Sequence, residues 1–378
     1  MTIATTSVQD PLAGFFSNLA NCRNKTYLTH GLHPYPAKFI PHIPRELVAA
    51  LALPGWPVLD PMCGSGTTLV EAALQGHTAI GIDINPIAVL AARAKTVLPC
   101  DALTRDIERL IEDLRARAEQ PHRIRSTPPS FRNSTKWFAD HVLRELAYVV
   151  HAIEGAEPCA RAVALAAASA VVVGVSNQES ETRWCAKANT VAPGHALTRI
   201  ADKLHLALAR LDEYGALGPA SAEVHRADAR SLPLRDASVG TIVTSPPYAN
   251  SHDYYLYNKL RMFVLGYDVA PVQTGEIGSR NKHSDLKAPI GDYLSEMHEA
   301  LIEWRRVLVP GGRAAVVVGD AVVRGELFDM ATEFERIAAA AGFKPQRRYE
   351  FSHRVHNASF QRGFGTKLAK RTHVLLLA

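Results

Sequence analysis

The segment VLDPMCGSGTTLVEAALQGHTAIGIDINP, residues 58–86, decides the fold of this chain. A short apolar strand ends at Asp60 and is followed by a glycine-rich turn and a helical stretch that Gly76 ends. A second strand, residues 78–85, leads to another helix with Pro86 in its first turn. This strand–turn–helix–strand–helix order is typical of the start of a parallel, doubly wound sheet.

The alternation breaks in the middle of the chain and resumes after Gly218. From about residue 102 to 217 the pattern is almost wholly helical, with two polar interruptions that carry Arg or Lys beside Trp, Phe or Asn. Further strands are expected at 222–229, 239–243, 313–320, 344–355 and 372–378, with helices at 293–308 and about 328–341. We therefore predict an α/β, Rossmann-like fold with a mostly parallel central sheet flanked by helices, plus a largely helical insertion. The expected divisions are 1–100, 101–218 and 219–378.

Composition restricts the class of protein. The 378 residues are 47% hydrophobic and 21% charged, which suits a folded core rather than disorder, and the formal charge of +5 favours an anionic partner. Five cysteines without a CxxC pair argue against a disulfide framework or zinc site, and we predict no metal. The N-terminus lacks a signal-peptide pattern, and the apolar run 162–175 reads as a buried helix, so we expect a cytoplasmic protein.

The glycine turn narrows the ligand. A Walker A loop would need a lysine after Gly66, and a dinucleotide fingerprint would need a third glycine where Leu69 stands. Asp83 lies 17 positions after Gly66, close to the spacing at which an acid takes the hydroxyls of a ribose. With Asp60 and Asp228, three acids follow predicted strands. The combination predicts a nucleoside-binding site.

Three motifs together resemble a known family. DPMCGSGTT (60–68), GIDINP (81–86) and TSPPY (244–248) are similar to motifs of the S-adenosylmethionine-dependent DNA amino-methyltransferases. Within that family the chain resembles the N4-cytosine type, whose catalytic tetrapeptide begins with serine. HPYPAKF (33–39) resembles the segment that wraps the methionine end of the cofactor. The resemblance covers residues 30–95 and roughly 222–340, but the long insertion matches no target-recognition domain that we know.

The resemblance implies roles for individual residues. The turn from Asp60 through Pro61, Cys63 and Gly64 to Gly66 should pass the methionyl part of S-adenosylmethionine. Its carboxylate should lie near Thr67 and Thr68, with Lys38 and Phe39 on the same side. Asp83 should bind the ribose and Ile84 should contact the adenine, while Asp228 and Ala229 should read the adenine amine.

The resemblance assigns Ser245, Pro246, Pro247 and Tyr248 as the catalytic tetrapeptide. An exocyclic cytosine amine is a weak nucleophile because its lone pair is delocalised into the ring. Hydrogen bonds from its N–H groups to Ser245 Oγ and the Pro246 carbonyl would favour a pyramidal nitrogen, and the prolines would hold that acceptor fixed. Tyr248 would stack on a base extruded from the duplex.

Four further segments are candidates for nucleic-acid contact. HDYYLYNKLRMF (252–263) combines aromatic rings with two basic residues, although a partly buried amphipathic helix explains it equally well. GSRNKHSDLK (278–287) looks like a mobile surface loop. Residues 344–371 carry eight basic residues against Glu350, which suggests phosphate contacts. The stretches around Arg123–Lys136 and Arg183–Lys187 are candidates for target recognition.

Alternative functions stay open from the sequence alone. The same chemistry could serve adenine N6 in DNA or a base in RNA, and a non-catalytic nucleic-acid-binding protein could keep this fold. A nicotinamide oxidoreductase is the least favoured alternative, because the third glycine of the dinucleotide fingerprint is missing. The expected partners are double-stranded DNA, a cognate restriction endonuclease and a second copy of the chain, since a two-fold dimer suits a palindromic site.

Overall fold

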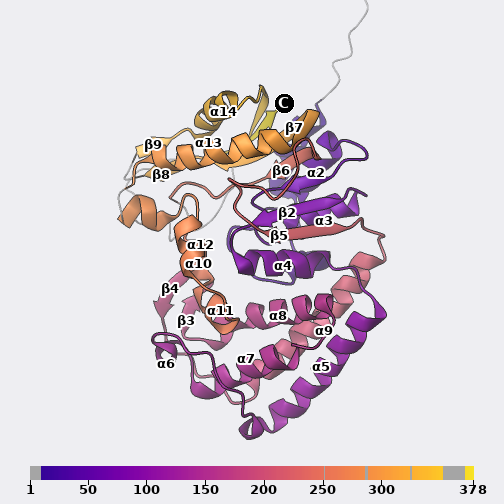
Figure 1. Ribbon diagram of the computed structural model, residues 1–378, viewed down its shortest axis with the longest axis vertical. Helices are drawn as coiled ribbons and strands as arrows, with labels where there is room; N and C mark the ends of the chain where they lie inside the picture. The colour runs from indigo at the N-terminus through magenta and orange to yellow at the C-terminus, as the bar shows by residue number, and fades with distance from the viewer. Residues whose placement is uncertain (1–9, 251, 286–287, 324–325, 352–370) are drawn as a thin grey trace, which may run out of the picture.

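A seven-stranded sheet forms the frame of the molecule (Figure 1), in the order β10-β11-β7-β6-β1-β2-β5. The computed structural model describes residues 10–250, 252–285, 288–323, 326–351 and 371–378. The strands of this sheet are β1 (Val58–Asp60), β2 (Ala79–Asp83), β5 (Ala222–Arg226), β6 (Val239–Thr244), β7 (Leu308–Gly319), β10 (Pro345–Phe351) and β11 (Thr372–Leu377).

The sheet is mostly parallel, which confirms the predicted fold class. β1 pairs in parallel with β2 and β6, β2 with β5, and β6 with β7, whereas β11 runs antiparallel to both β7 and β10. The chain passes from β1 to β2 on one side and places β6 on the other. β1 therefore marks a topological switch point, and a crevice is expected at its carboxyl end.

Helices cover both faces of the sheet, and the alternation of side chains along β7 separates the two layers. Val316 and Val318 pack with α13 (Ile290–Val307) and α14 (Met330–Ala340), whereas Ala315 and Val317 share a core with the other layer. That layer contains α1 (Pro11–Asn18), α2 (His42–Leu51), α3 (Thr67–Leu74) and α4 (Pro86–Thr96). The short 3-10 turns η1 (Leu19–Asn21) and η2 (Leu28–Gly31) join α1 to this region.

The helical insertion packs below α4 in Figure 1. It consists of α5 (Asp101–Glu119), η3 (Pro121–Arg123), α6 (Ser134–Trp137), α7 (Asp140–Ala152), α8 (Pro158–Val172), η4 (Val173–Val175) and α9 (His195–Gly215). Its core includes Leu90 of α4 and Val97, which directly follows α4. The insertion therefore continues the layer formed by that helix. The window Pro158–Val175 is long and apolar enough to cross a membrane, but 67% of it is buried inside the fold, which confirms the predicted buried helix.

Several elements differ from the sequence prediction. The second polar interruption forms a hairpin, β3 (Gln178–Ser180) and β4 (Arg183–Ala186), and a second hairpin, β8 (Ala321–Val323) and β9 (Glu326–Phe328), follows β7. The proline-rich stretch 33–44 was expected to be a loop throughout, but α2 already begins at His42. After β6 the chain forms α10 (Tyr254–Tyr257), α11 (Lys259–Val264), α12 (Ala270–Gly275) and the π-helix η5 (Asn281–Asp285).

The stretch 278–287 is not a surface loop where the structure describes it, because Ser279 and His283 are buried. Packing against Tyr293 explains this burial, since the His283 and Tyr293 rings meet edge to face at 6.4 Å and Gly278 lies against the same tyrosine. Residues 286–287 lie outside the described residues.

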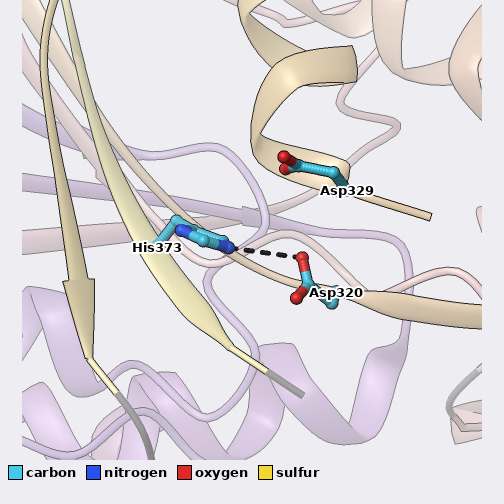
Figure 2. A group of neighbouring side chains, drawn as sticks. All are labelled: Asp320, Asp329 and His373. Carbon is cyan, nitrogen blue, oxygen red and sulfur yellow. Dashed lines mark hydrogen bonds and ion pairs between the residues drawn. The ribbon is translucent and has the colours of Figure 1, made fainter. Parts of the chain in front are cut away.

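Figure 2 shows a group with metal-ligand chemistry, Asp320, Asp329 and His373, at the carboxyl end of β7. Its polar atoms already have partners. His373 Nε2 lies 3.2 Å from Asp320 Oδ1, and Arg348 Nε lies 3.3 Å from His373 Nδ1. Arg371 binds Asp320 and Arg348 binds Asp329. Two guanidinium groups thus neutralise the acids, and we interpret the group as an ion-pair network that joins β7, β10 and β11.

This network also bears on the basic segment 344–371. Arg347 pairs with Asp10, and Arg348 and Arg371 pair with Asp329 and Asp320, so these three cations are engaged within the fold. These ion pairs compete with phosphate for the three side chains, and the expected phosphate contacts of this segment stay a prediction. Lys344 lies at the amino end of β10, and residues 352–370 lie outside the described part of the chain.

Candidate active site

A cleft with about 930 Å³ of free space opens at the carboxyl ends of β1, β2 and β6. This free space includes open solvent, and the part of it in which the centre of a water-sized sphere fits is about 120 Å³. The cleft lies at the switch point of the sheet, where the topology places a ligand. Fold and cavity thus agree on one location.

The cleft brings together most of the residues predicted from the sequence. It is lined by Lys38, Phe39, Asp60, Pro61, Cys63, Gly64, Thr67, Thr68, Asp83, Ile84, Asp228, Ala229, Ser245 and Pro247. Three predicted residues do not line it, namely Gly66, Pro246 and Tyr248. The cofactor motifs and the start of the catalytic tetrapeptide, about 180 residues apart in sequence, therefore face one cavity.

Gly66 allows the glycine turn to pack closely against α4. It has a left-handed φ of 79°, and a Cβ there would lie 2.8 Å from the Ala92 Cα. A side chain would therefore strain the backbone and push α4 away from the turn. Gly66 thus lets α3 begin directly against α4, below the floor of the cleft.

Asp83 fixes the glycine turn to the end of β2. Its Oδ2 accepts a hydrogen bond from Gly64 N at 2.9 Å, and its Oδ1 accepts one from Asn85 N at 2.8 Å. Each carboxylate oxygen keeps a second lone pair for a ligand. Asp83 therefore holds the turn in place and still offers acceptors to the cleft.

Carboxyl groups dominate one side of the cleft. Desolvation raises the pKa of Asp60 and of Asp83 to about 6, and that of the buried Glu276 to about 8. Both oxygens of Glu276 accept backbone N–H groups, from Tyr254 and Tyr255, at the start of α10. This side of the cleft favours hydroxyl donors or a cation over an anion.

One basic side chain, Lys38, lines the cleft from the segment that precedes α2. Lys38 Nζ donates to the carbonyls of His30 at 3.2 Å and His33 at 3.5 Å, which ties the proline-rich loop together. His30 in turn lies 2.7 Å from Glu71 of α3. The cleft is therefore polarised, with acids at the strand ends and lysine at the loop.

Asp228 is already paired with an arginine. Arg230 contacts both of its carboxylate oxygens, at 3.0 Å and 2.7 Å. Although burial acts in the opposite direction, this contact holds the pKa of Asp228 below its usual value. Arg230 also reaches Glu296 and the Gly275 carbonyl, so Asp228 belongs to a network that ties α12 and α13 to the end of β5.

The predicted catalytic tetrapeptide, residues 245–248, is held by β7 and α13. Ser245 Oγ donates to the carbonyl of Val317 at 3.2 Å, and Tyr293 Oη donates to the carbonyl of Pro247 at 2.9 Å. The ring of Tyr248 lies against Gly319, where a Cβ would come within 2.6 Å of Tyr248 Cε2. The loop is therefore fixed by contacts with residues far away in sequence.

Sequence reasoning missed several residues that line the cleft. Those missed are Tyr35, Pro36, Ala37, Met62, Ser65, Asn85, Tyr254, Val272, Gly275, Glu276 and Ile277. The rings of Tyr35 and Tyr254 stack with centroids 6.0 Å apart, and they close the cleft between the proline-rich loop and α10. Tyr35 lies inside the quoted HPYPAKF motif and could have been found there, but nothing in the sequence marked residues 272–277.

The two polar interruptions of the insertion meet beside α11 and form what we call the aromatic–basic surface. The Trp137 and Trp184 rings lie 4.3 Å apart, and the Phe131 and Phe263 rings lie 4.7 Å apart. Lys136 Nζ and Lys259 Nζ sit over these rings. Figure 1 shows β3, β4 and α6 on the same side of the molecule as α10 and α11.

Arg261 does not belong to that surface, although the sequence suggested that it could contact phosphates. It is fully buried, with Nε donating to the Ser169 carbonyl at 3.0 Å and a further nitrogen 2.5 Å from Glu181. Tyr255, Tyr257 and Leu260 are buried as well. The stretch 252–263 is therefore largely a structural connection between the catalytic loop and the insertion.

Comparison with known proteins identifies the family. Residues 9–93 and 239–361 match the DNA methylase family, which covers N6- and N4-specific amino-methyltransferases. The chain is 40% identical over 78 residues to the type II methyltransferase M.MjaII of Methanocaldococcus jannaschii, which is 21% of this chain and 15% of that protein. It is 32% identical over 163 residues to M.MvaI of Kocuria varians, which is 41% of this chain and 36% of the relative.

A longer but weaker match extends to M.BsoBI of Geobacillus stearothermophilus, 20% identical over 93% of this chain and 86% of that protein. Among solved structures, a DNA modification methylase from Thermus thermophilus in complex with S-adenosyl-L-methionine is 24% identical over 40% of this chain and 52% of its own, with a TM-score of 0.25. The chain thus spans well under half the length of the first two curated relatives.

Proposed function

The chain belongs to the S-adenosylmethionine-dependent DNA methylase family, and from this premise we propose that it methylates the exocyclic N4 amine of a cytosine in double-stranded DNA. The observation that carries the choice of cytosine is Ser245 at the head of the tetrapeptide, in the wall of the cleft. The reaction would modify a base that has been flipped out of the duplex, because an amine inside a base stack does not reach the wall of a cleft.

The polarity of the cleft fits S-adenosylmethionine. Asp83 would accept the ribose hydroxyls, and Ile84 and Ala229 would contact the adenine. The turn from Asp60 to Gly64 would pass the methionyl chain, and Lys38 would face its carboxylate. Arg230 already pairs with Asp228. We therefore propose that Asp228 fixes the residues around the adenine in addition to binding the adenine amine. When bound, the cofactor supplies an electrophilic methyl group on a sulfonium.

Ser245 is oriented to act as an acceptor. Because its O–H donates to the Val317 carbonyl, its lone pairs are left to accept an N–H of the substrate amine. An acceptor that is fixed before reaction stabilises the developing charge without reorganising. The amine loses one proton after the methyl group has transferred, and that proton leaves through Ser245 or to water.

The tyrosines and prolines of this site hold it rigid. Tyr293 fixes the carbonyl of Pro247, and Gly319 sets how deeply the ring of Tyr248 sits. Tyr248 is partly exposed, and we propose that its ring stacks on the flipped base at the edge of the cleft, an interaction worth ~1–3 kcal/mol per base. Pro246 would offer its carbonyl as the second acceptor for the amine.

We also propose that the insertion, residues 101–218, recognises the target through the aromatic–basic surface. Lys136, Arg183 and Lys187 are exposed there and would contact phosphates. Replacing both Lys136 and Lys187 with Glu should weaken DNA binding and reduce its salt dependence, whereas Arg305→Glu, at an exposed arginine of α13, should change neither. Equal effects of the two sets would contradict this role.

The identity of the product tests the proposal. Purified protein is incubated with unmethylated genomic DNA and S-adenosylmethionine, and the digested nucleosides are identified by mass spectrometry. We expect N4-methylcytosine. N6-methyladenine would replace the cytosine assignment while keeping the reaction class, a modified base in a parallel RNA digest would replace the substrate, and no product in either would favour a non-catalytic binding protein.

We propose the remaining partners from the same family membership. A cytoplasmic enzyme of this kind would serve as the modification half of a restriction system, beside a cognate endonuclease, or act alone. A homodimer would suit a palindromic site.

A further inference from the structure

A buried lysine lies behind the glycine turn. Lys95, in the last turn of α4, is 0% exposed, and its Nζ donates to Ser65 Oγ at 2.8 Å. Within the described part of the chain, no carboxylate forms an ion pair with it within 4.0 Å. A buried ammonium without a counter-charge is costly, so this group calls for an explanation.

The groups around Lys95 increase the cost. Burial, and then the charge of Lys38, depress the pKa of Lys95 well below its usual value. The charge of Lys95 in turn lowers the pKa of His30 and His33, after their own burial. The nearby acid Glu71 is already taken, since both Tyr27 and His30 contact its Oε1. This corner of the fold is therefore short of negative charge.

Ser65 connects Lys95 to the cleft. It lines the cavity, and its oxygen accepts the proton of Lys95. The hydroxyl hydrogen of Ser65 is therefore left to donate to an acceptor elsewhere, and an anion in the cleft would receive it. Lys38, which lines the same cleft, would reinforce that preference.

We infer that Lys95, acting through Ser65, is a positioning residue that selects the carboxylate of the amino-acid end of the cofactor. The inference rests on the proposed function and adds to it the group that supplies the counter-charge. The bound carboxylate would accept the Ser65 hydroxyl and so supply, through Ser65, the counter-charge that Lys95 lacks in the protein alone. Lys95 should thus matter for ligands with that carboxylate and be neutral for ligands without it.

Calorimetric titration of two ligands tests this selectivity. S-Adenosylhomocysteine carries the amino-acid group, and 5′-methylthioadenosine has the same nucleoside and thioether without it. Lys95→Met keeps a similar volume and removes the charge. We expect it to weaken S-adenosylhomocysteine about tenfold or more and to leave 5′-methylthioadenosine within about twofold. Ser65→Ala, which removes the hydroxyl and keeps the lysine, should show the same selectivity.

Stability separates this role from a structural one. The melting temperature of ligand-free Lys95→Met should not fall, because an apolar side chain replaces an unpaired buried charge. Lys344→Met serves as the control at an exposed lysine and should alter neither affinity. An equal loss for both ligands, or no loss for S-adenosylhomocysteine, would overturn the inference. If the wild-type protein bound neither ligand, the proposed function would fail, and this inference with it.

Discussion

Gly319 at the end of β7 offers a sharp test of how the catalytic loop is held. Its backbone is not left-handed, so Gly319→Ala adds a methyl group without backbone strain. That Cβ would lie 2.6 Å from Tyr248 Cε2 and 2.9 Å from Cδ2, whereas carbon atoms pack at about 3.5–4.0 Å. The ring of Tyr248 must therefore move by roughly 1 Å.

A displacement of this size at a reacting centre can cost about 100-fold in rate. We therefore expect Gly319→Ala to lower the methylation rate by about that factor while leaving the affinity for S-adenosylhomocysteine unchanged, since Tyr248 does not line the cleft. Single-turnover methylation of DNA and calorimetric titration measure the two quantities. The overpacking should also cost about 1–3 kcal/mol of unfolding free energy.

Two controls isolate the cause. Gly291→Ala, on α13, adds a methyl group with no atom within 4 Å and should leave the rate unchanged. In a double variant with Tyr248→Ala, the alanine at position 319 should cost nothing further, because the ring that it displaces is gone. A full rate for Gly319→Ala, or a loss that adds fully to that of Tyr248→Ala, would refute the reasoning.

Three other changes have defined outcomes. Tyr293→Phe removes the hydrogen bond to the Pro247 carbonyl and should lower the unfolding free energy in urea by about 1 kcal/mol, with a slower methylation rate at unchanged cofactor affinity. Arg261→Met leaves Glu181 and the Ser169 carbonyl without their donor and should cost about 2–4 kcal/mol by the same measurement; undiminished stability would show that the pair is dispensable. Burial raises the pKa of Glu276 from 4.5 to about 8, so the folded protein binds the extra proton in this window and its stability should fall as the pH rises from about 5 to 8. Glu276→Gln should flatten that fall in melting temperature, and an unchanged pH profile would count against the assignment.

The sequence was sufficient wherever local chemistry and spacing dictate the structure. The glycine turn, Asp83 at the end of β2 and the prolines after β6 each leave a local mark, and the parallel sheet brings their strand ends to one edge. The structure accordingly places Asp60, Asp83 and Ser245 in one cleft. The continuous apolar runs within residues 313–320 and 372–378 likewise predicted β7 and β11.

What the sequence could not show depends on contacts between distant segments. Arg261 looks like a surface cation until Glu181, 80 residues earlier, is folded against it. Gly319 and Tyr293 support the tetrapeptide from β7 and α13, and no local pattern distinguishes them from an ordinary strand glycine or core tyrosine. The β3–β4 hairpin has few β-branched residues, so strand propensity did not predict it. Trp184 of β4 packs against Trp137, with the two rings tilted relative to each other.

The most direct test of the account is methyl transfer by the wild-type protein and Ser245→Ala, measured with labelled S-adenosylmethionine and unmethylated DNA while S-adenosylhomocysteine binding is followed in parallel. Ser245 supplies an acceptor for the amine but makes no hydrogen bond to the glycine turn, residues 60–66. The variant should therefore bind the ligand normally and transfer methyl groups at least about 100-fold more slowly. Equal rates for the two proteins would contradict the central claim that Ser245 marks the reacting centre.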